Sequence, residues 1–178
     1  RLNGIFALDL GVFGVKVWAV GDGGVVLVST DPSGLVFGDA NPGARVLNNV
    51  GEGDPCQTVG QPAKLHEIFM FDVLTGWLIG EDGVLRYTAN GGTTWWYGNE
   101  PNTPFAFTPP WQFGCTADPY DPYVIHFFAD SSNQKGIIAS EFGKIFTTEN
   151  GGSTWTTETI LSVAGSICPE YEDNLEFW

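Results

Sequence analysis

The sequence predicts an all-β protein, a β-propeller arc of about three four-stranded blades. One segment recurs with Gly24, Gly83 and Gly143 at equivalent places, 59 and 60 residues apart. Each copy alternates apolar and β-branched residues between Gly, Asn and Asp, which is typical of short strands and turns. No stretch shows a helical period. Four-stranded units repeated at this length are typical of propeller blades.

The second copy shows its strands most clearly. Short apolar runs alternate there with turn residues, and a further strand opens after the second turn. The expected strands are Glu67–Asp72, Gly76–Gly80, Val84–Thr88 and Thr94–Tyr97. In the third copy, Thr156–Ile160 is expected to form an outer strand.

Two glycine-containing turns join these strands. Residues 81–83 (Glu-Asp-Gly) favour a hairpin turn in which Gly83 takes a positive φ, and residues 90–92 (Asn-Gly-Gly) favour a second turn. The repeat also aligns His66 with His126. Equivalent positions usually pack alike, so both histidines are expected to be structural; a shared metal would need more ligands than these two.

The chain is expected to form one propeller region over residues 1–178. The repeat units are 5–36, 65–97 and 123–160, joined by long connectors at 37–64 and 98–122. Residues 175–178 could begin the inner strand of a fourth unit. Propellers close with about 4–8 blades, so three units leave an open arc. The exposed edges of such an arc favour aggregation. They could be covered by further chain or by other chains, or the units could pack into a sandwich-like fold.

Net charge excludes several classes of function. The chain has a formal net charge of -14, with only 7 Lys and Arg in 178 residues. Nucleic-acid binding needs a basic surface, and anionic membranes repel acidic proteins, so neither partner is expected. No apolar run approaches the ~20 residues of a membrane span, so membrane insertion is not expected. The acidity suits solubility, Ca²⁺ binding or a basic partner surface.

Three stretches resemble known repeats. Residues 88–95 (Thr-Ala-Asn-Gly-Gly-Thr-Thr-Trp) and 148–155 (Thr-Glu-Asn-Gly-Gly-Ser-Thr-Trp) resemble Asp-boxes, also called bacterial neuraminidase repeats, with the pattern Ser/Thr-x-Asp-x-Gly-x-Thr-Trp. Residues 76–83 (Gly-Trp-Leu-Ile-Gly-Glu-Asp-Gly) are similar to the repeat of the photosystem II stability/assembly-factor propellers of cyanobacteria and chloroplasts. The connectors do not match, so the resemblance informs the blade type more than the function.

In Asp-box proteins the box is structural. The resemblance implies that the Asp or Asn side chain caps the turn by accepting backbone N–H groups, and that the Trp packs between strands. The residues with this expected role are Asn90, Gly92, Trp95, Asn150, Gly152 and Trp155.

The chain departs from these repeats in three ways. Both good copies carry Asn where the box usually has Asp, and the first copy follows Asp31 with residues 32–34 (Pro-Ser-Gly) and lacks the Trp. The photosystem relatives place Arg just before the box to build a basic patch. Here only Arg86 matches, with Leu27 and Phe146 at the equivalent positions, so a basic docking patch is not expected.

Enzymatic activity is not expected. Sialidases with Asp-boxes hold the substrate carboxylate with an arginine cluster, whereas this chain has three arginines in all: Arg1, Arg45 and Arg86. Other glycosidases need paired carboxylates, but no pair here stands in a context that singles it out. No Ser, His and Asp arrangement and no Cys-x-x-Cys spacing stand out either. No catalytic or metal-ligating residue is therefore predicted.

Aromatic residues after the second copy are the best candidate binding surface. Trp and Tyr flanked by Pro can anchor a protein partner or stack on sugars. The alternative is a loop that simply packs over the blades. The candidate binding residues are Arg86, Trp96, Tyr97, Trp111, Tyr120 and Tyr123.

The cysteines bear on the compartment. Cys56 and Cys115 are 59 residues apart, the repeat offset, and Cys168 follows in the third connector. Equivalent loops on neighbouring blades could be bridged, which leaves one cysteine over for further chain or another subunit. A disulfide implies an oxidising compartment, so we expect a secreted, periplasmic, lumenal or cell-surface protein. Three buried free thiols are the alternative.

These observations favour a non-catalytic extracytoplasmic scaffold or protein-binding subunit, similar to the photosystem assembly factors. The alternatives are a carbohydrate-binding or glycoside hydrolase-type module, and a self-assembling surface or filament subunit closed by copies of itself. Expected partners are accordingly a protein or the same chain, with a glycan under the second alternative. No cofactor is expected, and Ca²⁺ stays an open alternative.

Overall fold

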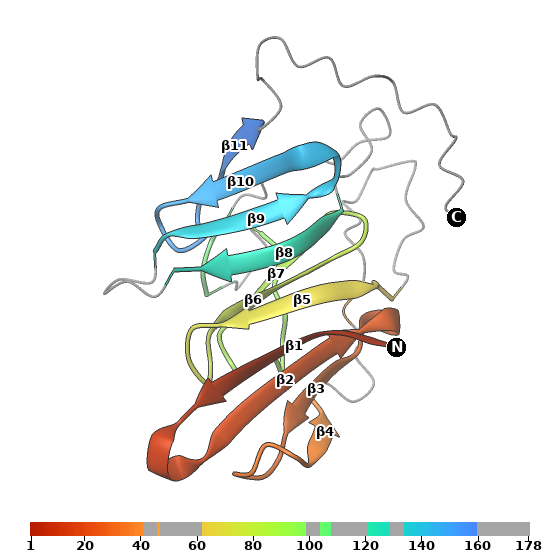
Figure 1. Cartoon of the computed structure of the whole chain (residues 1–178), viewed down its shortest axis with the longest axis vertical. Helices are drawn as coiled ribbons and strands as arrows, with labels where there is room; N and C mark the ends of the chain where they lie inside the picture. Colours follow the sequence, from red (N-terminus) through yellow and green to blue (C-terminus); the bar gives the residue numbers. More distant parts are fainter. Residues whose placement is uncertain (41–45, 47–61, 99–103, 108–120, 129–133, 160–178) are drawn as a thin grey trace, which may run out of the picture.

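The computed structural model describes residues 1–40, 46, 62–98, 104–107, 121–128 and 134–159. Within these residues, strands β1 to β11 form three antiparallel sheets, and the helices are short 3-10 segments. The sheets follow one another along the long axis, with β1, β5 and β8 side by side (Figure 1). These are three blades of a β-propeller arc, as predicted. No helix in the described residues is long and apolar enough to cross a membrane.

Blade 1 is the sheet β1-β2-β3-β4. Its fourth strand lies in the stretch predicted to be a connector, where it pairs with β3. Its elements are β1 (Leu2–Asp9), η1 (Gly11–Phe13), β2 (Val15–Gly21), η2 (Asp22–Gly24), β3 (Val26–Ser29) and β4 (Phe37–Asp39).

Blade 2 consists of β5 (Leu65–Met70), β6 (Gly76–Gly80) and β7 (Val84–Thr88). The predictions for β6 and β7 are confirmed at both ends. The first strand begins and ends two residues earlier than predicted. It begins at Leu65 because that residue pairs with Gly80, and it ends before Asp72 because the Asp72 carboxylate caps the next turn, accepting the backbone N–H groups of residues 74 and 75. In place of the predicted fourth strand, the described residues form one bridge, between Trp96 and Tyr87.

Blade 3 has the strand order β11-β10-β9-β8. Its outermost strand begins where the sequence predicted, and residue 160 lies outside the described residues. The elements are β8 (Pro122–Phe127), β9 (Gly136–Ser140), η3 (Glu141–Gly143), β10 (Lys144–Thr148) and β11 (Thr156–Thr159).

Both predicted turns of the second copy are confirmed. Gly83 has a φ of 66°, with Asp82 at 55° beside it, as a tight hairpin that follows the strand twist requires. Gly91 and Gly92 have φ values of 70° and 95°. Side chains rarely adopt these angles, so the glycines set the local path of the chain.

Each innermost strand contains one bulge near its start, where the register shifts. The extra residue is Asn3 in β1, His66 in β5 and Tyr123 in β8. His66 is therefore equivalent to Tyr123, and His126 to Phe69, so the predicted alignment of His66 with His126 is wrong. The reason is loop length: β5 and β8 begin 57 residues apart, at 65 and 122, whereas β6 and β9 begin 60 apart, at 76 and 136.

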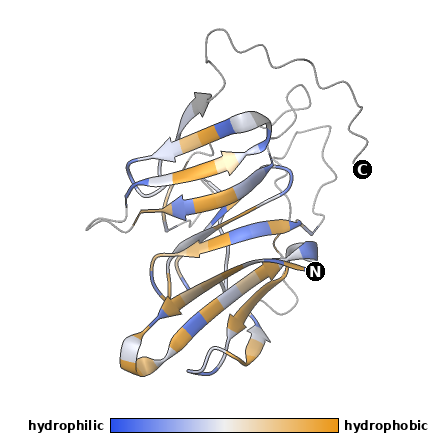
Figure 2. Cartoon of the chain, viewed as in Figure 1, coloured by the Kyte–Doolittle hydropathy of each residue, from blue (hydrophilic) through white to orange (hydrophobic). Residues whose placement is uncertain are grey.

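The core lies between the blades, and Figure 2 shows hydrophobic residues along the strands of all three sheets. Each sheet has a preceding face, toward the blade before it, and a following face, toward the blade after it. Trp18 on β2 and Trp77 on β6 hold equivalent places on the following faces and are fully buried. Between blades 1 and 2 the buried cluster is Trp18, Val20, Val26, Val46, Ala63, Leu65, Ile68, Met70, Leu78 and Val84. Between blades 2 and 3 it is Trp77, Ile79, Leu85, Phe107, Ile125, Phe127, Ile138 and Phe146.

The tryptophans of the two Asn-Gly-Gly motifs also lie at these junctions. Trp95 packs against the first cluster and Trp155 against the second. Each motif therefore attaches its blade to the one before it.

Candidate functional site

The three bulge residues form a row across the starts of the innermost strands. We call Asn3, His66 and Tyr123 the bulge row. Asn3 Nδ2 donates to the carbonyl oxygen of Leu65 (2.8 Å), and His66 Nδ1 lies 2.9 Å from the carbonyl oxygen of Pro122. Leu65 and Pro122 are the first residues of the next inner strands, so each side chain links its blade to the next. The Tyr123 ring, half exposed, stacks on His66 with 4.8 Å between ring centroids.

Every member of the bulge row faces a carboxylate of its own blade. That carboxylate stands directly after the second strand, at the start of the glycine turn. The pairs are Asn3 with Asp22 (Nδ2 to Oδ1, 2.8 Å), His66 with Glu81 (Nε2 to Oε1, 3.9 Å) and Tyr123 with Glu141 (OH to Oε1, 2.9 Å). The hydrogen bond from Asn3 lowers the pKa of Asp22, and the bond to Glu141 raises the pKa of the Tyr123 hydroxyl.

Backbone hydrogen bonds hold the turn acids at the edge of the arc. In all three blades, the N–H of the turn acid donates to the carbonyl of the residue just before the inner strand. The bonds run from Asp22 to Arg1 (2.8 Å), from Glu81 to Lys64 (2.8 Å) and from Glu141 to Asp121 (3.1 Å). The row is therefore built from the blade repeat itself.

Blade 3 carries a negative charge at the position where blade 2 carries a positive one. Lys64 forms an ion pair with Glu81, whereas the equivalent residue of blade 3 is Asp121. Asp121 Oδ1 accepts the Asp82 N–H (2.8 Å). Burial raises the pKa of Asp121, and the carboxylates of Glu141, Glu81 and Asp82 raise it further against the effect of that N–H. This end of the row is an acidic surface that accepts hydrogen bonds and positive charge.

Metal binding has no support within the part of the chain that the structure describes. No group of three or more His, Cys, Asp and Glu there has a metal-binding arrangement. The predicted cysteines, Cys56, Cys115 and Cys168, all lie outside the described residues.

The candidate binding residues separate into two places. The Arg86 guanidinium lies over the Tyr97 ring, 4.8 Å from its centroid, and Trp96 pairs with β7, so these three lie at the β7 edge of blade 2. Arg86 is buried there. Tyr123 lies in the bulge row on β8. The two other candidates, Trp111 and Tyr120, lie outside the described residues.

Sequence reasoning identified Tyr123 but missed its row. The signal was present, because an acid follows the end of the second strand in every copy, as Asp22, Glu81 and Glu141. The position of the bulge could not be predicted from the sequence, because no residue type in the repeat indicates which inner-strand residue is left unpaired.

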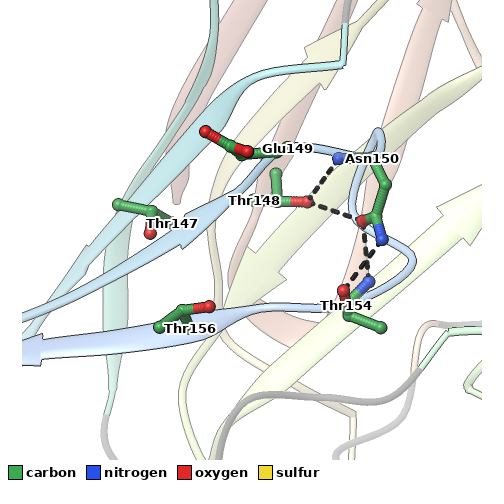
Figure 3. A pocket seen from close by; sticks show the side chains of 6 residues that line it. All are labelled: Thr147, Thr148, Glu149, Asn150, Thr154 and Thr156. Carbon is green, nitrogen blue, oxygen red and sulfur yellow. Dashed lines mark hydrogen bonds between the residues drawn. The ribbon is translucent and has the colours of Figure 1, made fainter.

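Both Asn-Gly-Gly turns contain the capping that the sequence predicts. Asn150 Oδ1 accepts the N–H of Thr154 (2.9 Å) and the hydroxyl of Thr148 (3.0 Å), and Asn90 accepts the equivalent pair. A hollow of about 370 Å³ lies beside the second turn (Figure 3). Its lining is Thr147, Thr148, Glu149, Asn150, Thr154 and Thr156. Polar side chains of this lining bond one another, which is the arrangement of a structural turn.

No protein-family model and no curated protein matches the sequence. Among solved structures, YCF48 bound to D1 peptide is similar, with a TM-score of 0.52 and 16% identity over 88% of this chain and 39% of that one. YCF48 from Cyanidioschyzon merolae has a TM-score of 0.49 and 20% identity over 89% of this chain and 38% of that one. This chain thus spans less than half the length of either structure. At this identity, the first likeness supports the propeller fold alone.

Proposed function

We propose that this chain is part of a non-catalytic β-propeller that binds a basic segment of another protein at the bulge row. The observation that carries the proposal is the row itself: three blades repeat a polar side chain paired with a turn carboxylate, and Asp121 adds a negative charge where blade 2 has Lys64. The YCF48 structure of similar fold is described as bound to D1 peptide, which supports a polypeptide as the class of ligand.

The geometry favours a positively charged ligand. Backbone bonds place the turn acids, and their carboxylates already contact Asn3, Lys64 and Tyr123, so part of their side-chain freedom is lost before any ligand arrives. Lys and Arg side chains form charge-assisted hydrogen bonds with such oxygens. The net charge of -14 attracts cationic segments over a longer range, most strongly at low salt.

The binding test uses fluorescence anisotropy with a short labelled peptide that alternates Lys and Ser. A matched peptide carrying Gln in place of Lys is the control ligand. We expect saturable binding of the Lys peptide alone, and about tenfold weaker binding to Asp121→Lys. Glu149→Lys makes the same charge change on the exposed turn between β10 and β11 and should weaken binding about twofold or less. Equal binding of both peptides, or equal loss in both variants, would overturn the proposal.

An extracytoplasmic location is the second part of the proposed function. Its support is the repeat spacing of Cys56 and Cys115. Thiol titration of the denatured, unreduced protein should find one free thiol out of three, because one bridge removes two. Three reactive thiols would contradict this location.

A further inference from the structure

The hairpin that joins β1 to β2 is longer than its equivalent in blade 2. In blade 2 the ladder between β5 and β6 ends at the pair Met70 and Gly76. The equivalent pair of blade 1, Ala7 with Val17, is followed by two more pairs that end at Asp9. At about 3.3 Å per residue, these pairs carry the turn roughly 7 Å farther out. Blade 2 forms without this extension, so the blade fold itself does not require it.

The tip of this hairpin exposes two apolar side chains almost completely. Val12 is 96% exposed and Phe13 is 78% exposed. Figure 1 shows their turn, between β1 and β2, standing out at the lower left of the molecule. Single apolar residues on a surface are ordinary, but these two are adjacent and stand on the extension that blade 2 lacks.

A missing neighbour on one side does not account for this exposure. Blades cover one another face to face along their strands. Ile5 on β1 lies on such a face and is 69% exposed, because its own sheet covers the rest of it. Val12 lies past the last pair of the ladder and is open on every side. Its exposure therefore follows from the length of the hairpin and not from the place of blade 1 in the arc.

Hydrogen bonds hold the tip in one conformation. The Leu10 N–H donates to the Gly14 carbonyl (2.8 Å), and Asp9 Oδ1 accepts the Gly11 N–H (2.8 Å). Gly14 has a φ of 94° and packs so closely that an added Cβ would lie 2.1 Å from the carbonyl oxygen of Pro32. The backbone of the tip therefore has little freedom left to lose on binding.

The loop between β5 and β6 adds two more exposed apolar residues at the same end of the blades. Val73 is 39% exposed and Leu74 is 53% exposed. This loop neighbours the hairpin of blade 1, because β1 and β5 lie side by side. Asp72 Oδ1 accepts the Leu74 N–H (2.7 Å), as Asp9 accepts an N–H in the hairpin. We call these four residues the loop patch: Val12, Phe13, Val73 and Leu74.

Negative charges surround the loop patch. Asp9 and Asp72 lie at the bases of the two loops, and Asp31 lies in the β3–β4 loop, which bonds the hairpin through the Val15 N–H. The hydrogen bond from the Ser33 hydroxyl lowers the pKa of Asp31, so this carboxyl is charged at neutral pH. Against these three carboxylates the same loops contain one ammonium group. It belongs to Lys16 and already donates to the Ser29 carbonyl (2.6 Å).

We propose that the loop patch binds a segment of another protein that presents apolar side chains flanked by Lys or Arg. Phe13 is the anchor, because aromatic side chains that enter a partner's pocket carry much of the binding energy. The surrounding carboxylates select basic neighbours for those apolar side chains, and with the net charge of -14 they repel anionic membrane surfaces. The patch lies past the ends of the inner strands and the bulge row lies at their starts, so this proposal does not depend on the bulge-row site.

Fluorescence anisotropy with a short labelled helical peptide of Leu and Lys tests the proposal. One control peptide replaces Leu by Ser and keeps the charge, and the other replaces Lys by Glu and keeps the apolar face. We expect the Leu–Lys peptide to bind wild type about tenfold more tightly than either control, and Phe13→Ser to lose about tenfold in that affinity. Phe128→Ser makes the same change at an exposed Phe of blade 3 and should leave the affinity unchanged.

Two further measurements keep the result specific to the patch. Circular dichroism should report an unchanged fold for both variants, because both side chains are exposed. The Ser–Lys peptide should bind Phe13→Ser as tightly as wild type, because it lacks the apolar side chains that the patch takes. Loss at the patch is thereby separated from loss at the bulge row.

Equal affinity of wild type and Phe13→Ser for the Leu–Lys peptide would overturn the proposal, as would a Leu–Glu peptide that binds equally tightly. Flotation with phosphatidylcholine vesicles and light scattering test the other occupants. Flotation of wild type but not of Phe13→Ser would assign the patch to lipid. A larger mass for wild type than for Phe13→Ser would assign it to a second copy of the chain. Either result would overturn the proposal as well.

Discussion

The junction between blades 1 and 2 and the junction between blades 2 and 3 both place a tryptophan against the Asn-Gly-Gly turn of the next blade. In the first, Trp18 Nε1 donates to the Gly91 carbonyl (3.0 Å). In the second, Trp77 Nε1 is buried with no hydrogen-bond partner among the described residues. The indole N–H at this repeat position is therefore hydrogen-bonded at the first junction and without a hydrogen-bond partner among the described residues at the second.

The residues that surround the two tryptophans differ, and those around Trp77 offer it aromatic contacts in place of a hydrogen bond. The first junction is mainly aliphatic, whereas rings surround Trp77 and add edge-to-face attraction to the buried area. Repeat equivalence thus fixes where a side chain lies but not which chemistry holds it. The rings around Trp77 are Tyr87, Phe105, Phe107, Phe127 and Trp155, at centroid distances of 5.1, 6.0, 4.7, 6.5 and 6.5 Å.

The largest expected effect comes from removing either ring. Trp18→Ala and Trp77→Ala should each lower the free energy of unfolding by about 3–5 kcal/mol, because each leaves a large cavity between blades. Urea denaturation followed by circular dichroism measures this. Ile137→Ala removes the equivalent, half-buried residue of blade 3 and should cost less than about 2 kcal/mol. An equal loss in all three variants would mean that burial at the junctions does not decide stability.

The next effect separates the turns that the tryptophans touch. Gly92 and Gly152 have φ values of 95° and 94°, so alanine at either position costs about 1–2 kcal/mol in backbone strain. Only at Gly152 would the new Cβ also meet Trp77, at 2.5 Å, for a further loss of about 1–3 kcal/mol. Thermal unfolding of both variants gives the difference. Gly151→Ala, with open space around the new Cβ, is the strain control. A Gly152→Ala loss equal to the control would disprove the close contact.

A smaller difference tests the hydrogen bond itself. Trp18→Phe should cost about 1–2 kcal/mol more than Trp77→Phe, because it leaves the Gly91 carbonyl without the indole donor while Trp77 has no such bond to lose. Urea titrations of the two variants under one buffer provide the comparison. Equal losses would show that the bond at the first junction adds nothing to stability.

The smallest effect is a pH dependence confined to the second junction. Glu67 Oε2 accepts the Ile125 N–H across this junction (2.7 Å), and the equivalent residue of blade 1 is Gly4. Burial raises the pKa of Glu67 against the lowering effects of that N–H and of His126. A raised folded pKa gives stability at low pH that is lost as pH rises past the ordinary value of about 4.3.

Wild type should therefore lose stability relative to Glu67→Gln as pH rises from about 4 to 6, by less than about 1 kcal/mol because the carboxyl is partly exposed. Denaturation of both proteins at a series of pH values measures the difference. Parallel stability curves would contradict the raised pKa.

The sequence by itself determined the all-β, propeller-like fold, the bounds of β6 and β7, both glycine turns and the asparagine caps. These features depend on residues a few positions apart, so the local pattern contains the whole interaction. One solved structure of low identity, with a TM-score of 0.52, supports the propeller fold. The chemistry of the long connectors, including the cysteines, stays a prediction.

Tertiary structure decided the rest. Asn3 meets a carbonyl 62 residues away and His66 one 56 residues away, and both contacts depend on how blades stack. Because one loop is longer in blade 3, a fixed repeat offset paired His66 with the wrong residue. The exposure of Ile5 could not be predicted from the sequence either, since Ile5, like the buried Ile68, is followed by Phe in an apolar strand. Burial belongs to the assembled blades and not to any one strand, so only the packed arc shows which apolar residues the neighbouring blades cover.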